Sequence, residues 1–537
     1  METDERVLER ARRARDARFD GRFFIGVKTT GIYCRPVCPV ASPKPVNVRY
    51  FPSAAAAAQA GFRPCLRCRP ESSPGTPAWL GSSATVSRAL KLIAGGSLDT
   101  GSVEDLAERL GIGSRHMRRL FLHYIGATPV AVAQTRRLHF AKKLIDETAL
   151  PMTQVAFAAG FGSIRRFNAT FQTLYGRSPS ELRRIGPQAG GAGAPNEYRF
   201  RLAFRPPYDW QALLEFLSPR VTPGVEAVSS NSYRRTISVD GKSGFLEARL
   251  LKGMPCLELR VHFPDPQALL RILERARRMF DLGADPVEIA RHLQHDRLLA
   301  KAVARRPGLR VPGAWDGFEL AVRAVLGQQV TVKGATTLAG RLAEEFGERT
   351  EHGLLFPSPE VLAEADYGRI GLTQARAQTL RELARAVCRG TISFEGARGL
   401  ELFVEEFSAI PGIGEWTAQY VAMRALGEPD AFPASDLGLL RAVTGIEGRV
   451  TAKALEKRAD AWRPWRAYAA MHLWTASSDA AAEAYSERRL PSGRRLPDGV
   501  QNAPVATPQT PSGVRGLHHR GRRLSSRRGA TPGQEKQ

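Results

Sequence analysis

Four closely spaced cysteines restrict the fold of this 537-residue chain more than any other feature. Cys34 and Cys38 form a wide pair, and Cys65 and Cys68 form a C-x-x-C pair after a long loop. Thiolates at this spacing suit tetrahedral Zn²⁺, with Zn–S distances of about 2.3 Å. Residues 1–19 are rich in charge and contain no apolar signal segment, so we expect a metal site rather than disulfides. Spacing alone favours a purely structural zinc ribbon.

Three breaks in composition divide the chain into several domains. Residues 70–77 (PESSPGTP) and 186–195 (GPQAGGAGAP) are typical of linkers, and from residue 486 the chain turns to Pro, Gly, Ser and Arg. The fold class we predict is multidomain α+β. The predicted domains are a cysteine module over 1–76, a helical domain over 82–186, an α+β lobe over 196–305, a mostly helical domain over 306–485 and a disordered basic tail over 486–537.

A large excess of positive charge indicates a polyanionic partner. The formal net charge is +25 and the pI is about 10.4. A basic tail on a neutral enzyme is the alternative, but arginine clusters also occur upstream of the tail, which favours nucleic acid. The chain contains no run of about 18 apolar residues, so we expect no membrane span. We expect a monomer in the bacterial cytoplasm, associated with the nucleoid.

The helical segment contains an internal repeat. Residues 102–111 and 114–124 read as helix, glycine turn, helix, and residues 152–159 and 163–175 repeat the design around a Gly-Phe-Gly turn. The second helix of each copy would offer polar side chains to base edges in the major groove. The alternative is that these side chains only solvate exposed helix faces. The candidates are Arg115, His116 and Arg119 in the first copy and Arg165, Arg166 and Asn168 in the second.

Phenylalanines of the same segment are expected in its core. They are Phe121, Phe157, Phe161, Phe167 and Phe171. Their spacing around the two turns would turn them toward the interior of the repeat.

The remaining chain begins with strands and continues with helices. Alternating patterns over 198–204 and around 245–261 predict short strands, and from Pro266 onward the period is helical almost throughout. The sequence IPGIGEWTA, over 410–418, predicts a tight hairpin that opens a helix. There Gly412 and Gly414 would let backbone amides approach a phosphate. Asp436 follows a proline-containing turn. Its carboxylate is a candidate functional group, and the alternative is that it only caps the N-terminus of a helix.

The cysteine module resembles the Ada-type methylphosphotriester-sensing domain over about residues 10–70. The resemblance rests on DARFDGRF at 16–23, TTGIYCRPVCP at 29–39 and AGFRPCLRCRP at 60–70. It implies one Zn²⁺ held by all four cysteines, with Cys34 as an irreversible methyl acceptor. A metal-bound thiolate stays nucleophilic at neutral pH. Methylation would lower the negative charge of the site and so reduce repulsion from DNA.

The repeat resembles the AraC-type DNA-binding domain over about residues 84–184. The similarity is carried by SRHMRRLF at 114–121, AFAAGFGS at 156–163 and RFNATFQTLYGRSP at 166–179. It implies sequence-specific binding to promoter DNA and transcription activation, with RNA polymerase as a further partner.

The last large segment resembles the helix–hairpin–helix DNA glycosylase superfamily, specifically 3-methyladenine DNA glycosylase II, over about 197–485. PPYDW at 206–210, RAVLGQ at 323–328, the hairpin and WRPWRAY at 462–468 carry the likeness. It implies that Asp436 is the catalytic carboxylate, which stabilises positive charge on the sugar as the N-glycosidic bond breaks. A base flipped from the stack would enter an aromatic pocket. Its lining would be Phe216, Trp416, Tyr420 and Trp474.

Several positions depart from relatives of this superfamily. Trp416 stands where bifunctional members place a Schiff-base lysine, so water should be the nucleophile, and no cysteine follows Cys388, so an iron–sulfur cluster is not expected. Leu437 replaces a frequent aromatic residue, and Gln329 occupies a position where an apolar wedge is expected. Cys256 lies in strand-like sequence without a methyl-acceptor motif, so it is expected to be a core thiol.

Together these features predict an adaptive-response DNA repair protein. It would excise alkylated bases of the 3-methyladenine and 7-methylguanine class as a monofunctional glycosylase without a cofactor for that step. It would also sense methyl phosphotriesters through Cys34 and activate transcription. One alternative is a transcription regulator whose glycosylase unit only binds damaged DNA, and another is a zinc ribbon without methyl transfer.

Overall fold

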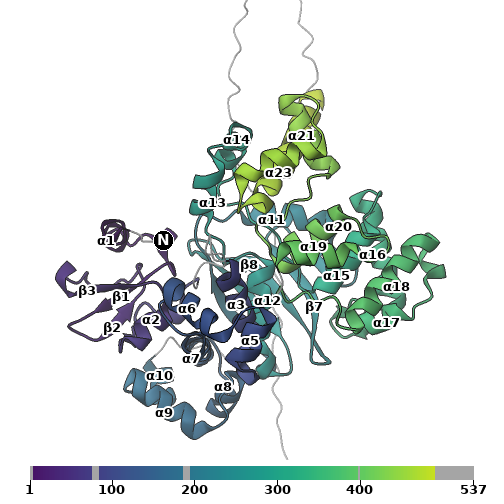
Figure 1. Ribbon diagram of the computed structural model, residues 1–537. Helices are drawn as coiled ribbons and strands as arrows, with labels where there is room; N and C mark the ends of the chain where they lie inside the picture. The colour runs from purple at the N-terminus through teal and green to yellow at the C-terminus, as the bar shows by residue number, and fades with distance from the viewer. Residues whose placement is uncertain (1–3, 75–83, 186–193, 397–398, 490–537) are drawn as a thin grey trace, which may run out of the picture. The chain divides into compact units, whose positions relative to one another are not determined.

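The computed structural model describes residues 4–74, 84–185, 194–396 and 399–489. The chain divides into two compact units, 1–483 and 484–537, and of the second only the end of one helix is described. Figure 1 shows the cysteine module, the helical repeat and the larger C-terminal domains in successive colours along the chain. Among the described residues no helix is long and apolar enough to cross a membrane.

A four-stranded sheet brings the cysteines of the first module together. The strand order is β3-β1-β2-β4, and β2 pairs in parallel with β4. Cys34 ends β2 and Cys65 follows β4, so this parallel pairing places the two cysteine pairs side by side. The elements are α1 (Glu5–Arg13), β1 (Phe24–Val27), β2 (Ile32–Cys34), β3 (Val48–Phe51), α2 (Ala54–Gln59) and β4 (Arg63–Pro64).

The helical repeat has the predicted design. The first copy comprises α5 and α6 and the second comprises α8 and α9, each pair joined by a short turn. Ser102 and Asp105 form a reciprocal capping box at the start of α5. The helices are α3 (Ala84–Ala94), α4 (Ser97–Thr100), α5 (Val103–Arg109), α6 (Ser114–Ile125), α7 (Pro129–Glu147), α8 (Met152–Ala158), α9 (Ile164–Tyr175) and α10 (Pro179–Ile185).

Four of the five phenylalanines expected in the core of the repeat pack there, and one does not. Phe121, Phe167 and Phe171 are fully buried, and Phe161 packs edge-on against Phe167 with ring centroids 5.2 Å apart. Phe157 is 47% exposed, so its predicted core position is wrong. The apolar face of α8 is formed by Val155, Ala156 and Ala158, and Phe157 falls on the opposite side of the same turn.

An antiparallel sheet begins the C-terminal region. Its order is β5-β9-β8-β7-β6, and side chains alternate between buried and exposed along β5, as the sequence predicts. Cys256 is buried at the start of β9, which confirms a core thiol. The elements are β5 (Glu197–Ala203), α11 (Trp210–Leu217), β6 (Glu226–Val228), β7 (Ser232–Val239), β8 (Lys242–Leu250), β9 (Cys256–His262) and α12 (Leu269–Met279).

Helices continue from here, around one buried apolar core. In Figure 1, α15, α16, α18, α19 and α20 lie grouped together. A two-stranded hairpin, β10 (Arg349–Thr350) and β11 (Gly353–Leu354), interrupts the predicted helical run. The helices are α13 (Pro286–Leu293), α14 (Arg297–Arg305), α15 (Gly317–Leu326), α16 (Val332–Phe346), α17 (Pro359–Ala363), α18 (Gln374–Cys388), α19 (Leu400–Ser408), α20 (Glu415–Val421), α21 (Leu437–Glu447), α22 (Ala452–Ala459) and α23 (Arg466–Arg489).

Short helical turns connect these elements. The 3₁₀ turns are η1 (Ala17–Phe19), η2 (Pro45–Asn47), η3 (Pro70–Ser72), η4 (Ser218–Arg220), η5 (Pro266–Ala268), η6 (Tyr367–Ile370) and η8 (Asp460–Trp462), and η7 (Ala422–Leu426) is a π turn that extends α20.

Two predicted boundaries change. The first predicted linker, 70–77, begins with the ordered turn η3, and its remainder from 75 lies outside the described residues. The final helix extends to Arg489, so its end overlaps the first four residues of the segment predicted as a tail. Residues 490–537 and most of the linker 186–195 lie outside the described residues.

Candidate functional sites

The four cysteines form a compact quartet. Their sulfur atoms all lie within 4.8 Å of one another. A tetrahedral Zn²⁺ with Zn–S distances near 2.3 Å needs sulfur separations of about 3.8 Å, so the quartet fits this ion with small adjustments. Four thiolates and no carboxylate or imidazole are a donor set typical of structural zinc rather than of Mg²⁺ or Ca²⁺.

The quartet is buried on one side and reachable on the other. Cys65 and Cys68 are buried, whereas Cys34 and Cys38 are half-buried. The Arg35 amide donates to Cys68 Sγ at 3.3 Å, and the Arg35 side chain is paired with Asp20. A cavity beside Cys34 is lined by arginines on several segments of this module, namely Arg12, Arg15, Arg35, Arg63 and Arg67. Arg12 and Arg35 are paired with Glu9 and Asp20, so Arg15, Arg63 and Arg67 supply the excess positive charge along this cavity.

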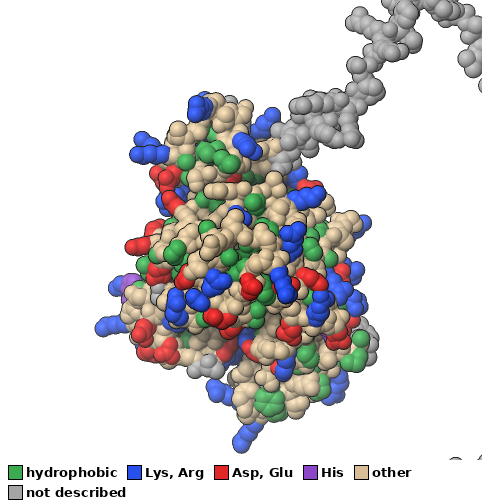
Figure 2. Space-filling model, turned by 90° about the vertical axis from the view of Figure 1, so that its right-hand side faces the viewer, with side chains coloured by type: hydrophobic (Ala, Val, Ile, Leu, Met, Phe, Trp, Pro, Cys, Tyr) green, Lys and Arg blue, Asp and Glu red, His purple; other side chains and the backbone are tan. Residues whose placement is uncertain are grey.

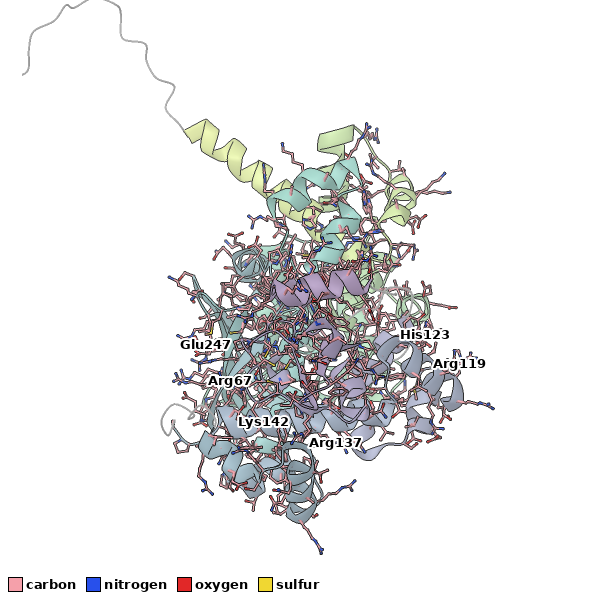
Figure 3. The ribbon with its side chains drawn as sticks, turned by 90° about the vertical axis from the view of Figure 1, so that its left-hand side faces the viewer. Arg67, Arg119, His123, Arg137, Lys142 and Glu247 are labelled. Carbon is pink, nitrogen blue, oxygen red and sulfur yellow. The ribbon has the colours of Figure 1, made fainter. Side chains whose placement is uncertain are left out.

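The candidate base-contacting residues of the helical repeat are exposed on α6 and α9. All six predicted side chains are exposed: Arg115, His116, Arg119, Arg165, Arg166 and Asn168. Arg119 donates to His116 Nδ1 at 3.0 Å. Figure 3 shows Arg119 and His123 on the outer side of α6. Exposure permits contact with DNA, and it also fits the alternative in which these charges only solvate the helix.

The predicted hairpin joins α19 to α20. Gly412 has φ +87°, and a Cβ there would lie 2.0 Å from Thr379 Oγ1, so only glycine fits. Gln328 ties the hairpin to the end of α15 by donating from Nε2 to the Gly412 carbonyl and to Thr417 Oγ1, both at 3.0 Å. Gly414 is the N-cap of α20 and has open space where a Cβ would stand.

Asp436 is a helix N-cap and also the acceptor of two indoles. Its Oδ1 accepts from the Leu439 amide at 2.9 Å, which caps α21. Trp474 Nε1 donates to Oδ1 at 2.8 Å, and Trp416 Nε1 donates to Oδ2 at 3.0 Å. The helix cap that the sequence offered as one role of Asp436 is therefore present, and the same carboxylate also faces the two tryptophans. The cap fixes the carboxylate, and the indoles orient both oxygens.

Aromatic rings surround this carboxylate. Trp416 and Tyr420 stack with centroids 5.5 Å apart and planes inclined by 9°, and Trp474 meets Tyr420 edge-on at 6.4 Å. Phe216, from α11, joins them through Arg424, whose guanidinium lies 5.0 Å from the Phe216 ring and 5.5 Å from the Tyr420 ring. The structure thus brings Asp436 into direct contact with Trp416 and Trp474, with Tyr420 next to both indoles and Phe216 joined to Tyr420 through an arginine.

Two arginines at this site were not anticipated from the sequence. Arg424 Nη1 donates to the Tyr420 hydroxyl at 2.7 Å, and the Arg220 guanidinium lies 3.9 Å from the centre of the Phe216 ring. Burial acts to raise the pKa of Tyr420, but the positive charges of Arg424 and Arg220 outweigh it and lower this pKa. The spacing of four residues from Tyr420 to Arg424, and from Phe216 to Arg220, was the available signal, since such pairs share a helix face.

The departures noted in the sequence have clear positions. Leu437 is 66% exposed at the start of α21. Gln329 has φ +55°, a conformation rare for a non-glycine residue, between α15 and α16.

Figure 2 shows the face on which the C-terminal domains lie; Lys and Arg side chains there are interspersed with Asp and Glu.

Four family models match successive parts of the chain. The metal-binding domain of Ada matches residues 8–71 and a helix-turn-helix domain matches 106–185. The AlkA N-terminal domain matches 199–316, and the HhH-GPD superfamily of base excision DNA repair proteins matches 322–467.

Known proteins resemble either the whole chain or its C-terminal part. A Mycobacterium tuberculosis protein named "Probable bifunctional transcriptional activator/DNA repair enzyme AlkA" is 41% identical over 486 residues, which cover 88% of this chain and 97% of that protein. The DNA-3-methyladenine glycosylase 2 of Escherichia coli is 33% identical over 281 residues, 51% of this chain and 96% of its own. A solved 3-methyladenine DNA glycosylase from Archaeoglobus fulgidus covers 52% of this chain and 98% of its own at 23% identity, with a TM-score of 0.47. The chain belongs to the family of bifunctional transcriptional activator/DNA repair enzymes of the AlkA type.

Proposed function

We propose that this protein is a monofunctional DNA glycosylase for alkylated bases, fused to a methyl-phosphotriester sensor that activates transcription. The observation that carries the glycosylase is the Asp436 carboxylate, which is fixed by a helix cap and two indoles beside stacked aromatic rings. In support, a relative over most of the chain is named as a transcriptional activator and DNA repair enzyme, and a relative over about half of the chain is named as a DNA-3-methyladenine glycosylase.

Charge complementarity explains the proposed base excision. As the N-glycosidic bond breaks, its electron pair passes to the base and positive charge develops on the sugar, next to the Asp436 carboxylate. An N-alkylated purine already carries a positive charge and departs as a neutral molecule. Water then adds to the sugar and gives up a proton. Trp416 occupies the lysine position of bifunctional relatives, so no Schiff base forms and the DNA strand is not cut.

The test of this proposal is release of base from duplex DNA that carries a single 7-methylguanine. We expect the native protein to release it and Asp436→Asn to be at least about 10³-fold slower, because the amide cannot stabilise the cationic sugar. Asparagine keeps a side-chain oxygen for the cap on Leu439, so the fold should survive. Binding of the variant to the same duplex provides the control. Binding without release by the native protein would establish the alternative, a regulator that only binds damaged DNA.

The N-terminal module supports a sensing function at Cys34. Zinc, when bound, keeps the sulfur deprotonated at neutral pH, and the surrounding arginines would hold a DNA backbone near it. The Cys34 sulfur would take a methyl group from a phosphotriester, which leaves as an ordinary phosphodiester. Mass spectrometry after exposure to methylated DNA should show a mass increase of about 14 Da on Cys34, which corresponds to one methyl group, and no increase on Cys68. An unmodified Cys34 would leave a purely structural zinc site.

Double-stranded DNA is the partner that we assign to the helical repeat and to the glycine hairpin. The net charge of +25 supports it, as do the exposed groups on α6 and α9 and the hairpin glycines Gly412 and Gly414. We also assign a second partner, RNA polymerase, for transcription activation in the bacterial cytoplasm. The domain limits that accompany this proposal are 1–76, 82–186, 196–305 and 306–485.

A further inference from the structure

Two cations beside the aromatic cluster have no carboxylate partner. Arg220 and Arg424 form no salt bridge within the part of the chain that the structure describes. Arg424 is buried and donates to the backbone carbonyls of Pro312 and Gly313 and to the Tyr420 hydroxyl. Arg220 is only partly buried, and its Nη1 donates to the Phe216 carbonyl at 2.8 Å. The Arg220 side chain also hydrogen-bonds to Tyr420, and of the five N–H groups of a guanidinium others remain for a ligand.

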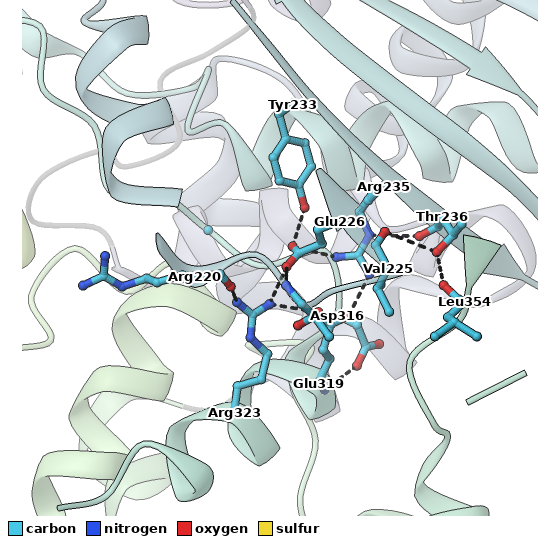
Figure 4. Close-up of polar contacts among 12 residues, drawn as sticks. Arg220, Val225, Glu226, Tyr233, Arg235, Thr236, Asp316, Glu319, Arg323 and Leu354 are labelled. Atoms are coloured by element: carbon cyan, nitrogen blue, oxygen red, sulfur yellow. Dashed lines mark hydrogen bonds and ion pairs between the residues drawn. The ribbon is translucent and has the colours of Figure 1, made fainter. Parts of the chain in front are cut away.

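A buried ionic network holds the backbone of Arg220 in place. Arg323, on α15, donates to the Arg220 carbonyl, and the same guanidinium pairs with Glu226 and Glu319, each at 3.0 Å. Arg235 pairs with Glu319 at 2.7 Å. Figure 4 shows this network, with the Arg220 carbonyl turned toward Arg323 and its guanidinium pointing away. The network therefore fixes the backbone of Arg220, while the guanidinium of Arg220 lies outside the network.

The network is electrically balanced, and so the charge of Arg220 is not consumed by it. Two carboxylates, Glu226 and Glu319, face two guanidiniums, Arg235 and Arg323. The Arg220 guanidinium instead covers the Phe216 ring.

We propose that Arg220 is a specificity-determining residue that hydrogen-bonds to bases leaving without a positive charge. This inference rests on the proposed glycosylase function. A neutral modified base takes the electron pair of the broken bond and becomes an anion until water protonates it. A guanidinium at the pocket stabilises that anion by a charge-assisted hydrogen bond. A cationic base leaves neutral and gains nothing from Arg220.

Two duplexes test the proposal, one with a single hypoxanthine as the neutral base and one with a single 7-methylguanine as the cationic base. For Arg220→Met we expect hypoxanthine release to slow by at least about tenfold, the loss typical of a charge-assisted hydrogen bond. Release of 7-methylguanine should stay within about threefold of the native rate. Arg220→Lys retains the charge and should recover part of the hypoxanthine activity.

A matched control removes an arginine from an exposed position. Arg291→Met deletes a guanidinium whose one carboxylate partner among the described residues is Glu288 on the same helix, and it should leave both rates unchanged. An equal loss on both duplexes in Arg220→Met would show that Arg220 only supports the fold. Failure of the native protein to release hypoxanthine, while it releases 7-methylguanine, would overturn the role of Arg220 and leave the glycosylase intact. Release of neither base would overturn the proposed function itself.

Discussion

Asp436 acquires its surroundings from residues far away in the chain. Trp416 and Trp474 reach it from α20 and α23, and its own helix supplies the Leu439 amide. Each donor is an N–H group directed at a carboxylate oxygen. The indoles also form part of the aromatic cluster, so the same side chains orient the carboxylate and shape the space next to it.

Trp416→Phe tests this double role. Phenylalanine keeps an aromatic ring to stack on Tyr420 but removes the indole donor to Asp436 Oδ2. We expect release of 7-methylguanine to slow by about tenfold or more, since a hydrogen bond to a charged group contributes about 1.5–3 kcal/mol. Trp210→Phe is the matched control, because its indole donates to the Asn231 carbonyl and not to Asp436. Equal effects of the two substitutions would show that Trp416 acts through packing alone.

At the scale of elements, the hairpin between α19 and α20 depends on close contact with α18 and on the end of α15. Gly412 packs directly against Thr379 of α18, and Gln328 bonds to its carbonyl. The backbone therefore approaches its neighbours more closely than any side chain allows. This contact fixes where α20 begins and hence where Trp416 and Tyr420 lie.

Two alanine substitutions in the hairpin should differ sharply. In Gly412→Ala the new Cβ meets Thr379 Oγ1 and the residue keeps a positive φ, so we expect a loss of about 2–4 kcal/mol in the free energy of unfolding. Gly414→Ala has open space and an ordinary φ, so the loss should stay below about 1 kcal/mol. Urea unfolding of both variants measures the difference. Comparable losses would contradict the steric argument.

A second prediction at this scale concerns Asp281, which follows α12. Burial raises the pKa of Asp281 from 3.8 to about 6, although Arg310 and the Tyr468 hydroxyl oppose this. The folded protein then holds more protons than the unfolded chain between about pH 4 and pH 6, so stability falls as the pH rises through this window. Asp281 is partly exposed, and we expect a loss of about 1–2 kcal/mol.

Asp281→Asn isolates that effect. Asparagine does not titrate, and it tolerates the left-handed conformation of this position, φ +48°. Urea unfolding at pH 4.5 and pH 6.5 should show the native protein losing stability relative to the variant. Parallel changes in the two proteins would rule out Asp281 as the titrating group.

On the scale of the whole molecule, two kinds of stabilisation occur in one chain. The module of residues 4–74 contains a small sheet and a cysteine quartet, whereas residues 194–483 contain a large apolar core. A small domain has too little buried surface to be stable without a further link such as a metal. The C-terminal domains do not have this need.

Removal of zinc should therefore separate the two functions. We expect a strong chelator to withdraw one zinc ion per chain and to unfold the N-terminal module, while release of 7-methylguanine stays within about twofold of the untreated rate. A colorimetric zinc assay and the base-release assay measure the two effects on one sample. Loss of base release in step with the zinc would contradict this independence.

The sequence by itself determined those features that depend on local pattern. The cysteine spacing, the two helix–turn–helix copies, the alternating strand predicted over 198–204 and the glycine hairpin all lie within short segments, where periodicity and residue type decide the conformation. The resemblance to known families also indicated Asp436 and its aromatic neighbours. Phe157 shows the limit of this approach, because an apolar residue near a turn can fall on either face of a short helix.

Only the tertiary structure decided how distant segments meet. The approach of Trp474 to Asp436, the parallel pairing that joins the cysteine pairs, and the packing of Gly412 on Thr379 are contacts between residues far apart in sequence. The same holds for the network of Glu226, Glu319 and Arg323 beneath Arg220. The physical reason is that a residue's charge or ring is fixed by its type, but its partners depend on how helices and strands pack around a common core.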